Sequence, residues 1–352
     1  MIQESSVVFP EHFGFCEGVA ASDDLLRDVT LEAQRLNIPN VYGYHEIVHN
    51  ADVVAAHVAA GVIFVEHVDE VPDDSVVVTS AHGVSPQVTD AFNKKGSVVF
   101  DAACPLVLHT HKAAKNARIK DETLIYVHGG NLEHDEVIGM IGHMDYDYDP
   151  LTGELRESPV NRSLLKLNQD PESLFDEIDI SSTDRFRVVT QTTLHANDSL
   201  AYRDAIKHAI QSKRPEAAVA YSAPGDVCRA VADRQKGVET LVELLPKRVV
   251  VVTDPGSKNG MGYVKLATEL TNGQEVAVFA VNSVEEAKAL GIESGVTAIT
   301  ASASTPDYTT FAVAQELGMQ SMPEITRERF NLHDARAGVI QQKLAAHLLR
   351  IS

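Results

Sequence analysis

Short runs of apolar residues alternate along the chain with longer segments in which apolar and polar residues recur at helical spacing. The apolar runs are rich in valine and isoleucine, as in VVVT at 76–79 and RVVVV at 248–252. Continuous runs of this kind are typical of parallel strands that are buried on both faces. Because helical segments separate them, the pattern predicts an α/β protein built on parallel sheets.

The individual elements follow from the same pattern. We expect strand-bearing segments over 7–15, 40–47, 62–66, 75–83, 97–104, 122–130, 185–194, 248–260, 275–283 and 296–306. We expect helices over 16–36, 50–61, 85–96, 105–121 and 198–213. Proline at position 105 suits the first turn of the fourth of these helices.

A chain of 352 residues is too long for one simple core, which predicts several domains. The predicted α/β domains cover 1–104, 105–216 and 217–322, and a tail over 323–352 is expected to pack on the body or on a partner. Within the second domain, the polar and turn-rich stretch 145–184 is expected to form an exposed excursion. A coarse repetition is also visible, because each of the three strand–loop–helix blocks contributes one cysteine.

Composition and charge exclude several classes of partner. The chain is 44% apolar and 23% charged, which is ordinary for a folded protein. Its net charge of −20 argues against nucleic acid or an anionic membrane as partner, since both need a basic surface. The first residues lack the features of a signal peptide, and no apolar run reaches the length of a membrane span, so we expect a cytoplasmic protein.

The chain has three cysteines, Cys16, Cys104 and Cys228, which are separated by 88 and 124 residues. An odd number of widely spaced cysteines with no CxxC pair argues against a disulfide framework, a zinc ribbon or thioredoxin-type chemistry. Each lies at the carboxyl end of a predicted strand or at a helix start, where ligands gather in parallel α/β sheets. Three thiolates could hold zinc with a fourth ligand, or a cubane iron–sulfur cluster with one open iron, and three unrelated buried cysteines are the alternative.

Short motifs around these positions occur in a distinctive order. They are GFCEGV, EIVHNADVV, GVIFVEHVDEVP, SAHGVSP, FDAACPLV, HDEVIGMIG, VVTQTTL, GDVCRAVADRQ and TASASTPD. Together they resemble the LytB/IspH family of 4-hydroxy-3-methylbut-2-enyl diphosphate reductases, over about residues 10–310. The resemblance implies three α/β domains in a trefoil around a cavity. It also implies a [4Fe-4S] cluster held by Cys16, Cys104 and Cys228.

The resemblance further implies the roles of individual residues in a reductive loss of an allylic hydroxyl. Glu136 would be the proton donor, with Thr192 in its relay. The substrate-binding residues, which would hold the diphosphate, are His49, His82, His134, Asn259 and Ser304. The matching motifs also include Gln191, Thr193, Arg234 and Gln235, for which an architectural role is expected.

The chain departs from the family pattern in the expected diphosphate site. The family continues Ser-Ser-Asn-Ser where this chain has Gly260, Met261, Gly262 and Tyr263, and Ser302 replaces a glycine. One interpretation is an isoprenoid reductase in which amides of a glycine-rich loop replace the lost side chains. Another is a paralogue with the same chemistry on a different substrate, in which Met261 and Tyr263 contact an apolar or aromatic group. The non-catalytic alternative is an iron–sulfur sensor, and a zinc hydrolase is the other enzymatic class.

Electrons for a reductase must come from another molecule. The chain lacks a flavin or nicotinamide fingerprint, because neither GGNLEH nor DPGSKNGMG contains GxGxxG after a first strand. The implied partners are therefore a small-molecule substrate and a small ferredoxin or flavodoxin as electron donor.

Overall fold

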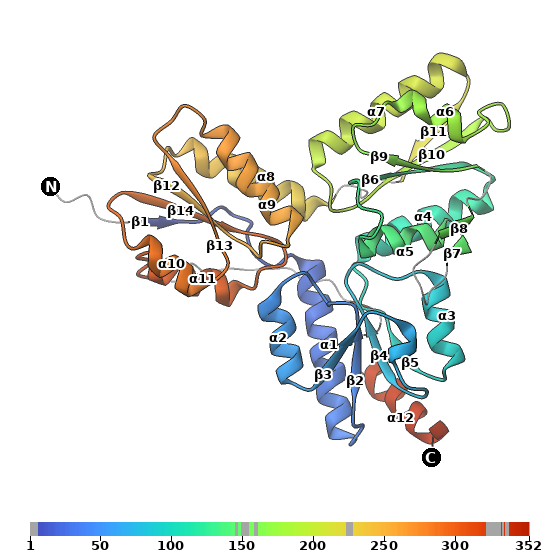
Figure 1. The fold of residues 1–352 in the computed structure, drawn as a ribbon, viewed down its shortest axis with the longest axis horizontal. Coiled ribbons are helices and arrows are strands. Elements are labelled where there is room, and N and C mark those ends of the chain that lie inside the picture. Colours follow the sequence, from blue (N-terminus) through green and yellow to red (C-terminus); the bar gives the residue numbers. More distant parts are fainter. Residues whose placement is uncertain are drawn as a thin grey trace. The chain divides into compact units, whose positions relative to one another are not determined.

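The computed structural model describes residues 6–144, 147–148, 155–157, 161–222, 228–321, 332, 334 and 338–351. The predicted excursion at 145–184 and the predicted tail at 323–352 therefore lie partly outside the described residues. The described chain forms three four-stranded sheets, in which all strand pairs are parallel, and one two-stranded antiparallel ribbon. The predicted α/β class with parallel sheets is confirmed (Figure 1).

The first sheet in the chain has the strand order β3-β2-β4-β5. Its strands are β2 (Val41–Tyr44), β3 (Val62–Val65), β4 (Val76–Thr79) and β5 (Val98–Phe100). The helices of this region are α1 (Glu17–Arg35), α2 (Ala51–Ala59), α3 (Pro86–Lys94) and α12 (Val339–Ile351), with the 3₁₀ turn η1 (Val68–Glu70). Val88 and Phe92 of α3 pack on the tyrosines and valines of one sheet face. Ser85 caps α3 by accepting a hydrogen bond from Val88 N–H, and Pro86 occupies its first turn.

The second sheet has the order β11-β10-β6-β9. Its strands are β6 (Thr123–His128), β9 (Arg162–Lys166), β10 (Arg185–Thr190) and β11 (Ala218–Tyr221). The accompanying helices are α4 (Pro105–Ile119), α5 (Asp135–His143), α6 (Leu174–Glu177) and α7 (Ala196–Lys213), with η2 (Pro171–Ser173), and the ribbon consists of β7 (Asp147–Tyr148) and β8 (Leu155–Glu157). Helices α4 and α5 cover one face, while α6 and α7 cover the other (Figure 1). Burial on both faces explains the continuous apolar runs.

The third sheet joins the start of the chain to its last third, in the order β1-β14-β12-β13. Its strands are β1 (Ser6–Val8), β12 (Arg248–Val252), β13 (Ala277–Val281) and β14 (Val296–Ala301). The helices are α8 (Arg229–Glu243), α9 (Lys258–Leu270), α10 (Val284–Leu290) and α11 (Asp307–Glu316). Helices α8 and α9 pack on one face and α10 and α11 on the other (Figure 1).

All three sheets share one strand order. In each, the strand that comes first in the repeat lies between the second and the third, and a fourth strand forms the edge beside the third. In the third sheet that fourth strand is β1, whose Ser6 pairs with Val296.

The chain divides into two compact units, 1–20 with 48–56 and 229–329, and 21–47 with 57–228 and 330–352. The predicted domain boundaries and the threefold arrangement of domains stay predictions.

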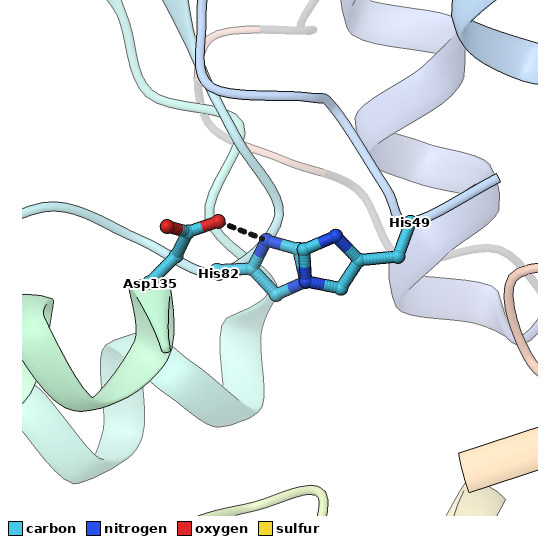
Figure 2. A group of neighbouring side chains, drawn as sticks. All are labelled: His49, His82 and Asp135. Atoms are coloured by element: carbon cyan, nitrogen blue, oxygen red, sulfur yellow. Dashed lines mark ion pairs between the residues drawn. The ribbon is translucent and has the colours of Figure 1, made fainter. Parts of the chain in front are cut away.

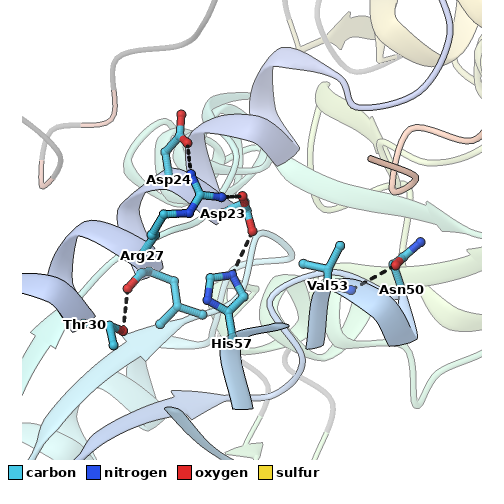
Figure 3. Close-up of polar contacts among 8 residues, drawn as sticks. Asp23, Asp24, Arg27, Thr30, Asn50, Val53 and His57 are labelled. Atoms are coloured by element: carbon cyan, nitrogen blue, oxygen red, sulfur yellow. Dashed lines mark hydrogen bonds and ion pairs between the residues drawn. The ribbon is translucent and has the colours of Figure 1, made fainter. Parts of the chain in front are cut away.

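Helices α1 and α2 are joined by a buried polar network (Figure 3). Nε2 of His57 lies 2.8 Å from Oδ1 of Asp23, and the other carboxylate oxygen of Asp23 pairs with Arg27. His57 is 5% exposed and Asp23 is 7% exposed, so neither group has water as its main partner. Such a buried pair stabilises its helices only while both partners are present.

No helix within the described residues combines the length and the apolar character that crossing a membrane requires.

Asp23→Asn is expected to lower the free energy of unfolding by about 1–3 kcal/mol, because it removes the buried charge that faces the buried His57 as well as the exposed Arg27. Asp24→Asn is the matched control, since Asp24 lies 2.8 Å from the same Arg27 but on a more exposed part of α1. We expect a change below about 1 kcal/mol for the control. Urea denaturation measures both, and equal losses would contradict the role assigned to the Asp23–His57 pair.

Candidate active site

The three cysteines occupy equivalent places in the three sheets. Each follows the fourth, edge strand of its sheet: Cys16 follows β1, Cys104 follows β5 and Cys228 follows β11. Each also stands directly before a helix, respectively α1, α4 and α8. The prediction that every cysteine lies at a strand end or a helix start is confirmed.

The same main-chain hydrogen bond holds each cysteine. The amide of Cys16 donates to the carbonyl of Ala303 at 3.3 Å, and that of Cys104 donates to Ala81 at 2.9 Å. The amide of Cys228 donates to Thr192 at 3.3 Å. In every case the acceptor lies in the loop after the third strand of the same sheet. The backbone at each cysteine is thus fixed to its neighbouring strand in the same way.

The backbone before Cys16 is held from a second side by Arg234 of α8. Its guanidinium donates to the carbonyls of Gly14 and Phe15, each at 2.9 Å, and to Ala230 O at 2.9 Å. Gly14 has a φ of 61°, a left-handed conformation that favours glycine. Arg234 is only 4% exposed, so its hydrogen bonds serve this turn rather than solvent.

Taken one at a time, each cysteine has the chemistry and the surroundings of a thiolate ligand to a metal. All three cysteines are free of disulfides, Cys16 is buried, and the other two are half-buried. Sγ of Cys16 accepts a hydrogen bond from Val19 N–H at 3.4 Å in the first turn of α1. The amino ends of helices favour negatively charged groups, which suits thiolate ligands at these three positions.

Glu136 lies in the first turn of α5 and is brought together with the loop after β10. Its Oε1 accepts a hydrogen bond from the amide of Thr192 at 2.6 Å, and its Oε2 accepts one from the hydroxyl of Thr193 at 3.2 Å. The side-chain amide of Gln191 donates to Thr193 Oγ1 at 3.1 Å. The structure therefore places Glu136 beside Thr192, the pair that the sequence motifs predict.

The pKa of the Glu136 carboxyl group lies near neutral pH. Burial raises its pKa from 4.5 to about 7, although hydrogen bonds from Thr192, Thr193 and Gln191 lower it. Burial, together with the nearby Glu136 charge, raises the pKa of Tyr126 well above 10, so that hydroxyl stays neutral. Glu136 is thus a group that can both hold and release a proton near neutral pH.

His134 and His82 lie close together beside the same end of α5. His134 caps the helix, and its Nδ1 accepts a hydrogen bond from Glu136 N–H at 3.2 Å. In its neutral form the ring then carries its proton on Nε2, where it can donate to an anion. The ring centroids of His82 and His134 are 5.7 Å apart.

The carboxylate of Asp135 lies beside His82 (Figure 2). Its Oδ2 lies 3.6 Å from Nδ1 of His82, and its Oδ1 lies 3.8 Å from Nδ1 of His45. Both separations exceed hydrogen-bond distance, so Asp135 acts on His82 through its charge, and Nδ1 of His45 lies closer to Oε2 of Glu66, at 2.7 Å. The sequence motifs did not lead us to expect Asp135 or His45 in this region. For Asp135, its position between His134 and Glu136 in the sequence could have indicated it.

The loop that carries His82 lies tightly on α5 because two helix positions are glycine. A Cβ at Gly139 would lie 3.1 Å from the carbonyl oxygen of Gly83, and one at Gly142 would lie 2.2 Å from Cβ of Ser85. Gly83 itself has a φ of 74°. These contacts set the distance between His82 and the first turn of α5.

The remaining predicted substrate residues lie at the ends of other strands. His49 follows β2 and precedes Asn50, whose side chain accepts a hydrogen bond from Val53 N–H at 3.1 Å (Figure 3). Ser304 follows β14, and its hydroxyl lies 3.2 Å from that of Ser302. Asn259 is half-buried in the first turn of α9.

The expected loop at Gly260–Gly262 is wrong, because these residues belong to helix α9. Ser257 caps the helix by accepting from Gly260 N–H at 3.2 Å, and Met261 N–H donates to Ser257 O at 3.0 Å. These two amides are therefore already used within the helix and cannot form the anion-binding nest that the glycines suggested. Two glycines in its first turns weaken the helix signal in the sequence.

Gly260 is required by packing. A Cβ there would lie 1.7 Å from Oγ1 of Thr253 and 3.0 Å from Cβ of Ser302. The two departures from the family pattern at 260 and 302 are therefore in contact, and a serine at 260 would collide with the hydroxyl-bearing residues at the end of the sheet.

Met261 and Tyr263 do not form a joint apolar surface for a ligand. Tyr263 is 1% exposed and packs in the core among valines of the third sheet and α8. Met261 is 40% exposed on α9. The interpretation that both residues line a pocket is wrong for Tyr263, which belongs to the core.

The chain is similar to proteins with a consistent name. A profile of the family described as "LytB protein" matches residues 7–318. The 4-hydroxy-3-methylbut-2-enyl diphosphate reductase of Francisella philomiragia is 31% identical over 320 residues, covering 90% of each chain. The reductase of the same name from Shewanella pealeana is 33% identical over 325 residues, covering 91% of this chain and 94% of the relative.

Solved structures show the same fold. The E-1-hydroxy-2-methyl-but-2-enyl-4-diphosphate reductase from Plasmodium falciparum aligns over 100% of both chains with a TM-score of 0.71 and 23% identity. A structure of (E)-4-hydroxy-3-methyl-but-2-enyl diphosphate reductase aligns with a TM-score of 0.61 and 23% identity over 90% of this chain and 99% of the other.

Gly260→Ala is expected to lower the free energy of unfolding by about 1–3 kcal/mol, because the added Cβ has no room beside Thr253. Gly262→Ala is the matched control, because nothing lies within 4 Å of the position that its Cβ would take. There the better helix propensity of alanine is expected to stabilise by up to about 1 kcal/mol. Thermal unfolding of both variants measures the difference, and a loss at 262 as large as at 260 would refute the packing argument.

The raised pKa of Glu136 predicts a specific pH dependence of stability. Between pH 4.5 and about pH 7 the folded protein keeps a proton on Glu136 that the unfolded chain has released. The stability contributed by this group therefore falls as pH rises through that window, by about 3 kcal/mol in all. Urea midpoints of wild type and Glu136→Gln should diverge over this range, with the variant gaining relative stability toward neutral pH. Parallel curves would mean that Glu136 titrates at its ordinary pKa.

Proposed function

Because the chain belongs to the LytB family, we propose that it is an iron–sulfur reductase that removes the allylic hydroxyl of 4-hydroxy-3-methylbut-2-enyl diphosphate. The observation that carries the proposal is the equivalent placement of three cysteines after the edge strands of three sheets of identical order. The reaction consumes two electrons and two protons and releases water.

Cys16, Cys104 and Cys228 would hold the [4Fe-4S] cluster through their thiolates. When bound, such a cluster supplies electrons and an iron without a cysteine ligand that can act as a Lewis acid. The protein fixes the three ligands through the repeated cysteine amide bond, and it holds the turn before Cys16 through Arg234.

Glu136 is proposed as the proton donor to the leaving oxygen. Its pKa of about 7 leaves a proton on the carboxyl in a large fraction of molecules at neutral pH. The amide of Thr192 holds Oε1 at 2.6 Å, so the carboxyl group has one fixed orientation. The Thr192 side chain also lowers the pKa of Glu136, which supports its proposed part in the proton relay.

The diphosphate is proposed to bind through imidazole and hydroxyl donors. His134 would present Nε2–H because its Nδ1 accepts from Glu136 N–H, and His82 lies 3.6 Å from the carboxylate of Asp135, whose charge favours a protonated ring. Ser304, His49 and Asn259 complete the proposed set. Donors to a charged ligand contribute about 1.5–3 kcal/mol each, so a few of them can retain an anion on a chain of net charge −20.

One observation favours a second candidate, a paralogue that reduces a different substrate. Neither Gly260 nor Gly262 offers a side-chain donor, and the amides of Gly260 and Met261 are bonded to Ser257. The first turns of α9 therefore provide fewer hydrogen-bond donors for an anion than the Ser-Ser-Asn-Ser sequence of the family would. A substrate with the same allylic hydroxyl but without a diphosphate would not need them.

An external one-electron donor completes the proposed reaction. A small ferredoxin or flavodoxin is the proposed partner, since the reductase itself would bind only the cluster.

The deciding experiment combines metal analysis with an anaerobic assay. The protein is purified without oxygen, its iron, sulfide and zinc are quantified, and reduction of 4-hydroxy-3-methylbut-2-enyl diphosphate by dithionite is followed. Iron, sulfide and turnover together are the expected result. A cluster without turnover on this compound favours the paralogue or a sensor, and zinc without sulfide refutes the iron–sulfur proposal.

Glu136→Gln is expected to lower kcat by about 10²–10⁴-fold, because glutamine cannot donate a proton to the leaving oxygen. Glu133→Gln is the matched control, since Glu133 is exposed in the turn just before α5. Iron content should stay unchanged in both. Retention of full kcat in Glu136→Gln would remove Glu136 from the mechanism.

A further inference from the structure

Every amide from Asp101 to Cys104 is hydrogen-bonded. Ala102 N–H donates to Thr79 Oγ1 at 3.2 Å, and Ala103 N–H donates to Asp101 Oδ1 at 3.0 Å. Cys104 N–H donates to Ala81 O at 2.9 Å. The acceptors of these three bonds lie in or next to the sheet that precedes Cys104. The acceptor of the fourth amide, that of Asp101, lies far away along the chain.

The amide of Asp101 donates to Oδ2 of Asp334 at 3.0 Å. Asp334 is 7% exposed, and the same oxygen lies 2.7 Å from Nζ of Lys343 on α12. Lys343 also donates to Val99 O at 3.0 Å, and its ammonium lies 4.9 Å from the ring centroid of the fully buried Phe100. Two tail residues therefore contact three consecutive residues that lead into the Cys104 turn.

The tail is attached to the same region at a second point. Arg350 donates to the carbonyl of Gly96 and lies 3.6 Å from Asp74, before the start of β5. Helix α12 thus runs along the edge strand with one anchor near each end of it (Figure 1). Of these two anchors, the one formed by Asp334 and Lys343 reaches the residues that precede Cys104.

We propose that Asp334 and Lys343 are positioning residues that fix the backbone before Cys104 and so stabilise a metal cluster at that cysteine. The family profile ends at residue 318, so this support is supplied by a part of the chain beyond the match. A carboxylate that accepts from a main-chain amide and is itself neutralised by a lysine holds that amide more firmly than water does. The proposal rests on the proposed function for its metal-binding part, because it takes Cys104 as a ligand.

The test compares Asp334→Ala with Arg350→Met in the full-length, anaerobically purified protein. Both variants remove one tail anchor, but only Asp334→Ala removes the acceptor of Asp101 N–H. The readouts are amide hydrogen exchange over 101–104, the rate of iron loss to a chelator, and the EPR spectrum of the reduced protein. Asp334→Asn, which keeps an oxygen acceptor, tests whether the effect is rescued by a conservative change.

We expect Asp334→Ala to speed exchange at Asp101 and its neighbours by about 10-fold or more, and to speed iron loss by about 10-fold. Arg350→Met should leave both rates within about twofold of wild type, and Asp334→Asn should fall between. Unchanged exchange in Asp334→Ala overturns the proposal. Faster exchange with unchanged iron loss and EPR spectrum also overturns it, by reducing the anchor to a purely structural role. If wild type binds no iron, the proposed function fails, while the exchange data still decide whether the tail holds this turn.

Discussion

The geometry of the proposed site depends on one hydrogen bond that occurs three times. In each sheet the amide of a cysteine donates to the carbonyl of a residue after the neighbouring third strand, at 2.9–3.3 Å. The bond ties the end of the short edge strand to the sheet, and the helix that follows the cysteine starts from that point. Because β1 and β5 have three residues each and β11 has four, the strands alone would hold these turns weakly.

Beyond this repeated bond, different side chains hold the backbone before Cys16 and before Cys104. The guanidinium of Arg234 donates hydrogen bonds to the two carbonyls before Cys16, whereas the carboxylate of Asp334 accepts a hydrogen bond from an amide before Cys104. A similar division separates the polar residues at the other strand ends. The second sheet carries the buried carboxyl of Glu136, and the third carries the hydroxyls of Ser302 and Ser304. The group proposed to donate a proton and the hydroxyls proposed to bind the substrate thus belong to different sheets of the same strand order.

Much of this could be predicted from the sequence, and the exceptions have physical causes. The strands and their helices follow from runs of valine and isoleucine, and the site residues on the second sheet follow from short motifs. The pairing of Ser6 with Val296 could not be predicted, because local patterns carry no information on which distant strand completes a sheet. The start of α9 was missed because Gly260 and Gly262 obscure it, and the need for Gly260 appears only when Thr253 and Ser302 are placed beside it. Asp334 carries no motif, and its role depends entirely on the folding back of the tail.

The origin of β1 has a consequence for how the protein is made. The strand is synthesised first, yet its partner β14 ends at Ala301, and the acceptor for the Cys16 amide is Ala303. The first cysteine therefore leaves the ribosome long before its own sheet exists, whereas the sheet before Cys104 can form as soon as its strands emerge. On the proposed function, the turn that would present the first cluster ligand is therefore fixed only after Ala303 has been synthesised. Loading of the proposed cluster would accordingly follow the formation of the third sheet, and the Cys16 turn would lack its hydrogen bond to Ala303 until then.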